Sequence, residues 1–436
     1  MIHGLERSAS RIPKILILFL WIACIFDPIG QIYGMKYIAI AAVCGLLAFN
    51  IATRLRLPGM TPGYYFIFFL FVIFYPAYGL FVTVFRGGFG GKFIDTSYLA
   101  AALYFICSVV YFYPGYAQIA YRSMVIALRL LSVVILISLC AVSLGVFDSL
   151  LGFFMAHGVA YLGTRNYAGI NFYYIYYISS PMLVFLLCHD TWRLMERVTL
   201  LRGLAVISCA AALFLSGTRA SILLAVSAPL LVGIWYYLGR KTLLVMAGGI
   251  AALALALTLF HIPVLSEMFG AGEASNSIKI GYLSQYWSLF DDTDVLLFGQ
   301  GYNAHVWSAA VASLLPEGAS KTELTYLELV RVFGVMGLLL FIGVVLRLSA
   351  MTMRAQQAQG WLAPAVILYC AISAINPYIF STNGMLLFGF AAVAVTTRAR
   401  GAPLYHTPLF TKKTGRPGVP PNASGSPATP VSLATR

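Results

Sequence analysis

A single arginine, Arg219, interrupts a long apolar run in "ALFLSGTRASILL", residues 212–224. Gly217 permits a tight turn, and the hydroxyls of Ser216 and Thr218 can cap backbone groups on either side of it. A helix that begins at Arg219 would direct its first amides and the guanidinium the same way, which is the outline of an anion site. The alternative is an arginine that anchors a helix end among lipid headgroups.

A second Gly-Thr-Arg tripeptide occurs in "YLGTRNYAGIN" and contains Arg165. Arg165 also stands beside an apolar run, so interfacial anchoring is again the alternative. Two such arginines facing one cavity would suit a pyrophosphate, because guanidinium groups bind phosphate oxygens through paired hydrogen bonds.

Two carboxylates and another arginine lie together in "KTELTYLELVRVFGVMG", residues 321–337. Glu328 and Arg331 are three residues apart, so they share a helix face and can pair with each other. The functional interpretation is a general base set beside cations that bind a leaving phosphate. Glu323 is expected closer to water, and a structural role is the alternative for each carboxylate.

The remaining polar residues give weaker signals. Asp291, Asp292 and Asp294 lack the other ligands of a calcium loop and predict a solvated turn. His157 and His305 could each act as a base or simply lie at the surface. The sequence has no HExxH, nucleophile elbow or Walker loop, and its seven cysteines lack CxxC spacing. No metal or cofactor site is therefore predicted.

The composition is that of an integral membrane protein. Of 436 residues, 61% are hydrophobic and 10% are charged, whereas about a quarter are charged in soluble domains. The basic residues stand singly between apolar runs, so the net charge of +14 does not indicate a nucleic-acid partner. We predict an all-α polytopic fold with a cytoplasmic N-terminus (1–13), one transmembrane domain (14–397) and a disordered cytoplasmic tail (398–436).

Twelve segments are apolar enough to span a bilayer, which takes about 20 residues. They are 14–33, 35–53, 63–85, 96–113, 124–146, 167–188, 203–218, 221–239, 242–262, 325–346, 361–379 and 384–397. With both termini in the cytoplasm, 20 of the 28 lysines and arginines fall on the inner side, as the positive-inside rule requires. Arg122 and Arg129, at the start of the fifth span, are expected at the membrane interface.

Two outer loops, 147–166 and 263–324, exceed the usual length of a connection. The longer one lies between spans nine and ten and is rich in Tyr, Trp, Leu and Phe. This composition predicts short helices lying over the outer membrane face.

Together these motifs resemble those of the O-antigen polymerase and ligase superfamily, which includes the Wzy-type polymerases. The resemblance covers about 160–345 and lies in the order of "LSGTRASILL", "LFGQGYN" and "ELTYLELVRVFGVMGLLLFI". It implies a GT-C-like glycosyltransferase of the bacterial inner membrane. The enzyme would act at the periplasmic face on glycans carried by undecaprenyl pyrophosphate, without a cofactor, alongside a flippase and a chain-length regulator.

The resemblance also assigns roles to residues. Ligases and many other relatives have a histidine where this chain has Glu323, which favours a polymerase over an O-antigen ligase and makes Glu323 the first candidate for the general base. Glu328 is the second candidate. The implied pyrophosphate ligands are Arg219, Arg165, Lys279 and Arg331, and the residues that could hold sugar rings are Tyr282, Trp287, Tyr302 and His305. A single displacement without a covalent intermediate would invert the anomeric configuration.

A transporter of lipid-linked oligosaccharides is the alternative from another class. Transporters place polar groups near the bilayer midplane, on broken helices of two repeated halves. Here the ionisable residues are expected at outer span ends and in one long loop, which favours chemistry at the outer face.

Overall fold

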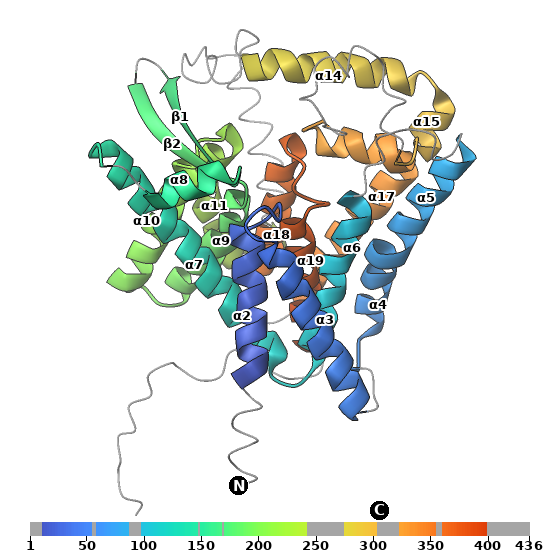
Figure 1. The fold of residues 1–436 in the computed structure, drawn as a ribbon, viewed down its shortest axis with the longest axis horizontal. Coiled ribbons are helices and arrows are strands. Elements are labelled where there is room, and N and C mark those ends of the chain that lie inside the picture. The colour runs from blue at the N-terminus through green and yellow to red at the C-terminus, as the bar shows by residue number, and fades with distance from the viewer. Residues whose placement is uncertain are drawn as a thin grey trace, which may run out of the picture. The chain divides into compact units, whose positions relative to one another are not determined.

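The structure is a computed structural model, and the chain divides into two units, Met1–Leu404 and Tyr405–Arg436. The structure describes residues of the first unit only, and most of these residues are helical (Figure 1). The predicted ninth span (242–262), His305 and the predicted disordered tail lie outside the described residues. The described ranges are 11–54, 58–86, 97–146, 149–167, 170–241, 274–302, 322–354 and 360–398.

Five helical stretches of the described chain are long and apolar enough to cross a membrane. This supports a membrane-embedded protein, while the number of twelve spans stays a prediction. Four of them are single helices: Met35–Thr53 in α3 (Met35–Arg54), Tyr116–Ser143 (α7), Arg219–Leu238 (α11) and Thr325–Thr352 in α17 (Thr325–Arg354). The fifth, Pro62–Phe85, consists of α4 (Pro62–Phe68), the π-helical η1 (Phe69–Phe74) and α5 (Tyr75–Phe85).

Shorter apolar helices pack among these five. α2 (Arg11–Phe26) packs on both α3 and α7. Further short apolar helices are α6 (Ser97–Cys107), α10 (Leu200–Phe214), α18 (Leu362–Ile372) and α19 (Thr382–Arg398). Three 3-10 turns extend neighbouring helices: η2 (Ser108–Phe112) follows α6, η4 (Gly239–Lys241) follows α11, and η6 (Ser373–Ile375) follows α18.

The predicted sixth span, 167–188, is wrong as a single helix. Its first part is strand β2 (Ile170–Tyr177), which pairs antiparallel with β1 (Ala160–Tyr167). After the 3-10 turn η3 (Ser180–Met182), α9 (Leu183–Glu196) begins. The sequence "INFYYIYY" is rich in isoleucine and aromatic residues, which favour strands, and a short apolar run does not reveal its period. The all-α prediction therefore fails at this hairpin.

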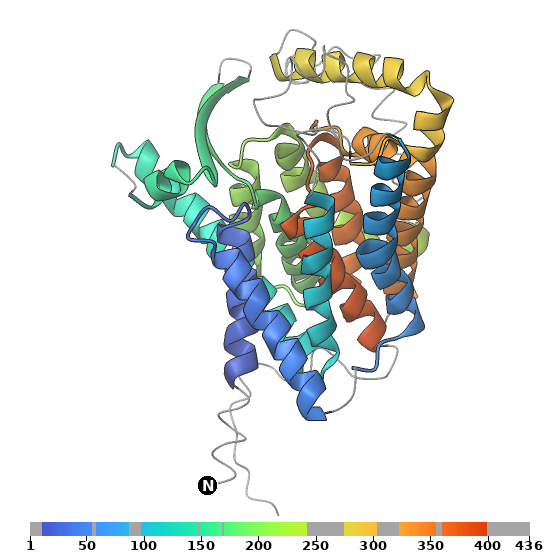
Figure 2. The same ribbon diagram turned by 45° about the vertical axis from the view of Figure 1, so that its right-hand side comes forward.

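Both of the long loops that the sequence predicts at the outer face contain regular structure. The first holds α8 (Ser149–Ala156) and β1, and the described part of the second holds α14 (Ala274–Phe290) and α15 (Thr293–Phe298). The described part of the long loop is thus helical, while its position over the outer membrane face stays a prediction. Figures 1 and 2 place α14 across the end of the helix bundle at which β1 and β2 also lie. The aspartate turn before α15 includes Asp292, whose carboxylate accepts the Asp294 amide at 2.9 Å and caps the helix.

The Gly-Gln-Gly segment after α15 ties the long loop to the bundle. The Gly301 amide donates to the Val332 carbonyl at 3.0 Å, at the point where α17 is kinked. The kink residue, Gly334, has a φ of 70°, and a Cβ there would collide with the Leu297 carbonyl. Only glycine fits this backbone position, so the "LFGQG" and "FGVMG" motifs form one structural joint.

Candidate functional site

The Arg219 turn, residues 215–219 between α10 and α11, forms as the sequence predicts. Gly217 has a φ of 75°. The Thr218 hydroxyl accepts an amide of the first turn of α11 at 3.2 Å, and the Ser216 hydroxyl donates to a carbonyl of α10 at 2.7 Å. Arg219 is therefore the first residue of α11, and its half-buried side chain stands at a helix N-terminus, which favours an anion.

The β1–β2 hairpin packs directly on the Arg219 turn. The Ile175 amide of β2 donates to the Leu215 carbonyl at 3.0 Å. Beside this bond, the Tyr174 side chain lies so close to Gly217 that a Cβ on the glycine would collide with it. The turn therefore requires glycine for its positive φ and for the approach of the tyrosine.

The register of the hairpin places Arg165 beside the same contact. Directly opposed residues of two paired strands share one face of the sheet. We call one such face the tyrosine face; it consists of Tyr161, Gly163 and Arg165 of β1 and Phe172, Tyr174 and Tyr176 of β2. The far end of the Tyr174 ring lies on Gly163, and the Arg165 guanidinium lies 5.3 Å from the ring centroid, within cation–π range. One tyrosine thus packs on the glycines of both Gly-Thr-Arg tripeptides, and the structure brings the two segments together.

Glu323 and Lys279 pair with each other at the same end of the bundle. Lys279 Nζ of α14 lies 3.2 Å from Glu323 Oε2, and the carboxylate is largely exposed while the lysine is half-buried. The ion pair positions a predicted base beside a predicted phosphate ligand and holds α14 over the start of α17.

Besides their burial, the charge of Glu323 raises the pKa of tyrosines at this end of the bundle, among them Tyr176 and Tyr282. Burial raises the pKa of Tyr176 to about 12; its hydrogen bond with Tyr378 lowers the pKa, and the nearby Glu323 carboxylate raises it. Burial and then Glu323 also raise the pKa of Tyr282 on α14. The Tyr176 and Tyr378 hydroxyls are 2.6 Å apart, which fixes β2 to the segment before α19.

Strand β2 therefore connects both halves of the candidate site. Tyr174 lies at the Arg219 turn, and Tyr176, two residues along the same face, bonds Tyr378 at 2.6 Å. The segment that contains Tyr378 also accepts a hydrogen bond from Thr325, two residues after Glu323. Two residues of a strand cover about 7 Å. A group of cations and a carboxylate thus flank one aromatic surface, and the tyrosines that join them were missed because their pattern was assigned to a membrane helix.

Glu328 and Arg331 occupy a different environment from the other predicted site residues. Both side chains are buried, and Arg331 Nε donates to Glu328 Oε2 at 2.7 Å. The other carboxylate oxygen accepts the Thr322 amide at 2.6 Å. A buried pair with this bonding offers no surface to a substrate, so we assign both residues to the structural alternative.

The aromatic residues suggested for sugar binding are dispersed. Tyr302 is fully buried, and its hydroxyl donates to the Tyr75 carbonyl at 3.0 Å, which leaves no ring face for a sugar. Tyr282 is buried in a small apolar cluster, whereas Trp287 is exposed on α14. His157 lies at the end of α8 with its ring against Phe153, and His305 lies outside the described residues.

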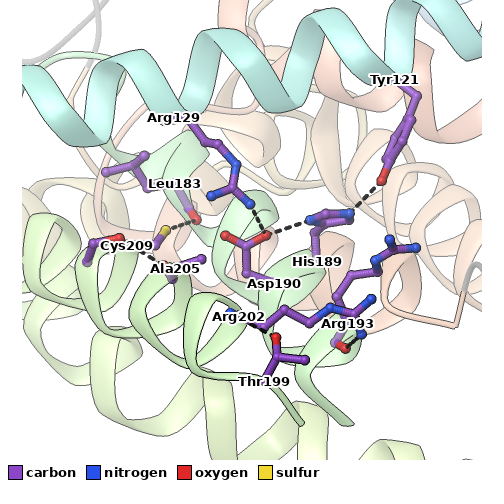
Figure 3. Close-up of polar contacts among 11 residues, drawn as sticks. Tyr121, Arg129, Leu183, His189, Asp190, Arg193, Thr199, Arg202, Ala205 and Cys209 are labelled. Carbon is purple, nitrogen blue, oxygen red and sulfur yellow. Dashed lines mark hydrogen bonds and ion pairs between the residues drawn. The ribbon is translucent and has the colours of Figure 1, made fainter. Parts of the chain in front are cut away.

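A second polar cluster joins α7 to α9 (Figure 3). His189 lies 2.5 Å from the Tyr121 hydroxyl through Nε2 and 2.8 Å from Asp190 Oδ1 through Nδ1. Arg129 Nη2 donates to the same carboxylate oxygen at 2.7 Å. The interfacial prediction for Arg129 missed this partner, although an adjacent His and Asp at the end of an apolar run are a signal of a polar network.

Replacing Arg129 with alanine should lower the free energy of unfolding by about 1–3 kcal/mol, because Asp190 would stay buried without its cation. The loss is smaller than for a fully buried pair, since the Arg129 side chain is 45% exposed. Thermal unfolding in detergent measures it. Arg193→Ala, which breaks the looser pair with Glu196 at 3.7 Å, is the control, and equal shifts for both variants would contradict the prediction.

Comparison with known proteins gives no relative for this chain: no model of a protein family matches it, and no curated protein matches it. Across the described residues, no group of three or more His, Cys, Asp or Glu side chains is placed to hold a metal ion.

Proposed function

We propose that this protein is a membrane glycosyltransferase that polymerises an exopolysaccharide or O-antigen. Its donor would be a glycan on undecaprenyl pyrophosphate, and its acceptor a second lipid-linked repeat, at the periplasmic face of a bacterial inner membrane. The observation that supports this most is the tyrosine face, on which Tyr174 contacts the Arg219 turn and Tyr176 lies about 7 Å further along the strand. The Tyr176 hydroxyl bonds that of Tyr378, in the segment whose Asn376 carbonyl accepts the hydroxyl of Thr325, two residues after Glu323. Cations and a base are thereby available to one substrate.

The proposed reaction is a single displacement at the anomeric carbon of the donor. An acceptor hydroxyl forms the new C–O bond while the C–O bond to the pyrophosphate breaks, so the anomeric configuration inverts. Glu323 accepts the hydroxyl proton, and undecaprenyl pyrophosphate leaves with its charge held by Arg219 and Arg165. The leaving group is already activated, so the residues need only to bind, orient and accept one proton.

The polymerase and the related ligase differ in the acceptor that they use. Glu323 in the place of a histidine favours the polymerase, which extends chains before they reach lipid A core. The glycan ladder of cells decides between them: loss of the protein should leave a single repeat on lipid A for a polymerase and no glycan there for a ligase. Intact ladders in its absence would contradict both.

Replacing Arg219 with alanine should lower glycan transfer about a hundredfold, the loss typical when one preorganised contact to a developing charge is removed. The assay is the chain-length ladder made from purified lipid-linked repeats by the reconstituted protein. Arg347→Ala is the matched control, because Arg347 lies 5.1 Å from the Phe66 ring on other helices. Long chains at normal abundance from the Arg219 variant would refute its role.

The tyrosine face predicts a difference between two equally exposed tyrosines. Tyr161 is 52% exposed and stacks on Tyr176 at a centroid distance of 6.2 Å, whereas Tyr173, 48% exposed, lies on the opposite face. Tyr161→Ala should raise the KM for the acceptor about 3- to 10-fold through loss of an aromatic contact. Tyr173→Ala should leave it unchanged, and equal effects would show that the face is not selective.

A further inference from the structure

A cleft of about 700 Å³ opens between α2, α3 and the start of α7, away from the candidate site. α2 and α3 meet at the turn that joins them and diverge toward Arg11 and Arg54 (Figures 1 and 2). The turn end is fixed, because the Asp27 carboxylate accepts the Ile32 amide at 3.0 Å and Lys36 Nζ donates to the Pro28 carbonyl. The divergence therefore leaves the space at the other end.

The walls of the cleft are mostly apolar. Phe49 and Ile12, two of its lining residues, are exposed, as expected for side chains that meet lipid tails. On the floor, a Cβ added to Gly45 would meet no atom within 4 Å, so the helix surface is bare there. Water gains little in an apolar space that opens to hydrocarbon, so an acyl chain is the fitting occupant.

The mouth of the cleft is basic. Lys14 lines it, and Arg11, one turn earlier on α2, is also exposed. None of the described residues that line the cleft is acidic. Asn50, which is buried, adds a polar group to the lining near the end of α3. Basic side chains at a helix end beside an apolar space complement a phosphate headgroup above an acyl tail.

We propose that this cleft binds one anionic glycerophospholipid, with an acyl chain between α2 and α3 and its phosphate at Lys14 and Arg11. The site is independent of the proposed glycosyl transfer. Bound there, the lipid would fill the space between the first two helices and hold α2 in place against α7.

The test uses the full-length protein, delipidated in mild detergent and titrated with phosphatidylglycerol or phosphatidylcholine. Native mass spectrometry should show one phosphatidylglycerol retained in preference to phosphatidylcholine. Lys14→Ala, an exposed change that leaves folding intact, should reduce this preference about fivefold, the share of one basic contact near anionic lipid. Gly45→Phe, which fills the cleft, should abolish retention.

Gly233→Phe is the matched control, because Gly233 on α11 also has open space around it and should bind as the wild type does. Unchanged binding by Gly45→Phe would place the acyl chain elsewhere. Equal binding of the two lipids, or an unchanged preference in Lys14→Ala, would overturn the headgroup assignment. Recovery of a polyprenyl lipid in place of phospholipid from native membranes would overturn the lipid class.

Discussion

Glu323→Gln should slow glycan transfer about 10²–10⁴-fold, the range in which a general base contributes. The substitution keeps the size of the side chain and removes its ability to accept the acceptor proton. Folding should be unaffected, because the carboxylate is largely exposed and its ion pair with Lys279 lies at the surface of α14. Single-turnover formation of a two-repeat product from lipid-linked repeats measures the chemical step.

Lys279→Met separates the base from the ion pair. This variant loses the same 3.2 Å contact but keeps the carboxylate, so it should retain much more activity than Glu323→Gln. Equal losses in the two variants would remove the evidence for Glu323 as the base. Loss of the ion pair, or of Lys279 as a pyrophosphate ligand, would then account for both. Normal rates for Glu323→Gln would remove the proposed mechanism altogether.

The Arg219 turn could be predicted from sequence because its causes are local. Gly217 supplies the positive φ and Thr218 caps the helix that follows it, and both act within four residues. Long apolar helices such as α7 and α17 were predicted for a similar reason, since their composition alone requires burial or lipid.

The hairpin and the polar clusters could not be predicted, because partners distant in sequence decide them. The segment "INFYYIYY" forms a strand because β1 supplies hydrogen-bond partners for its backbone and because the Tyr174 side chain packs on Gly217. The repeated Gly-Thr-Arg tripeptide was visible in the sequence, yet its shared contact with one tyrosine was not. Arg129 was likewise predicted at the membrane interface, because its partner Asp190 lies 61 residues away in the sequence.

Glu328→Ala should lower the free energy of unfolding by about 3–5 kcal/mol, the cost of leaving a buried charge uncompensated. Arg331 would lose the carboxylate that holds it at 2.7 Å, and the Thr322 amide would lose its acceptor. The expected phenotype is a loss of folded protein in the membrane, measured by thermal unfolding and by the yield of monodisperse protein.

The double variant Glu328→Leu/Arg331→Met distinguishes a structural pair from a catalytic one. Replacing both charges of a buried pair by apolar groups of similar volume is often neutral, so the double variant should regain most of the lost stability. If the pair is structural, glycan transfer should return with folding, because neither side chain is exposed to a substrate. A double variant that folds but transfers no glycan would instead place Glu328 or Arg331 in the reaction, and would require the joint formed by α15 and the kink of α17 to open toward the tyrosine face.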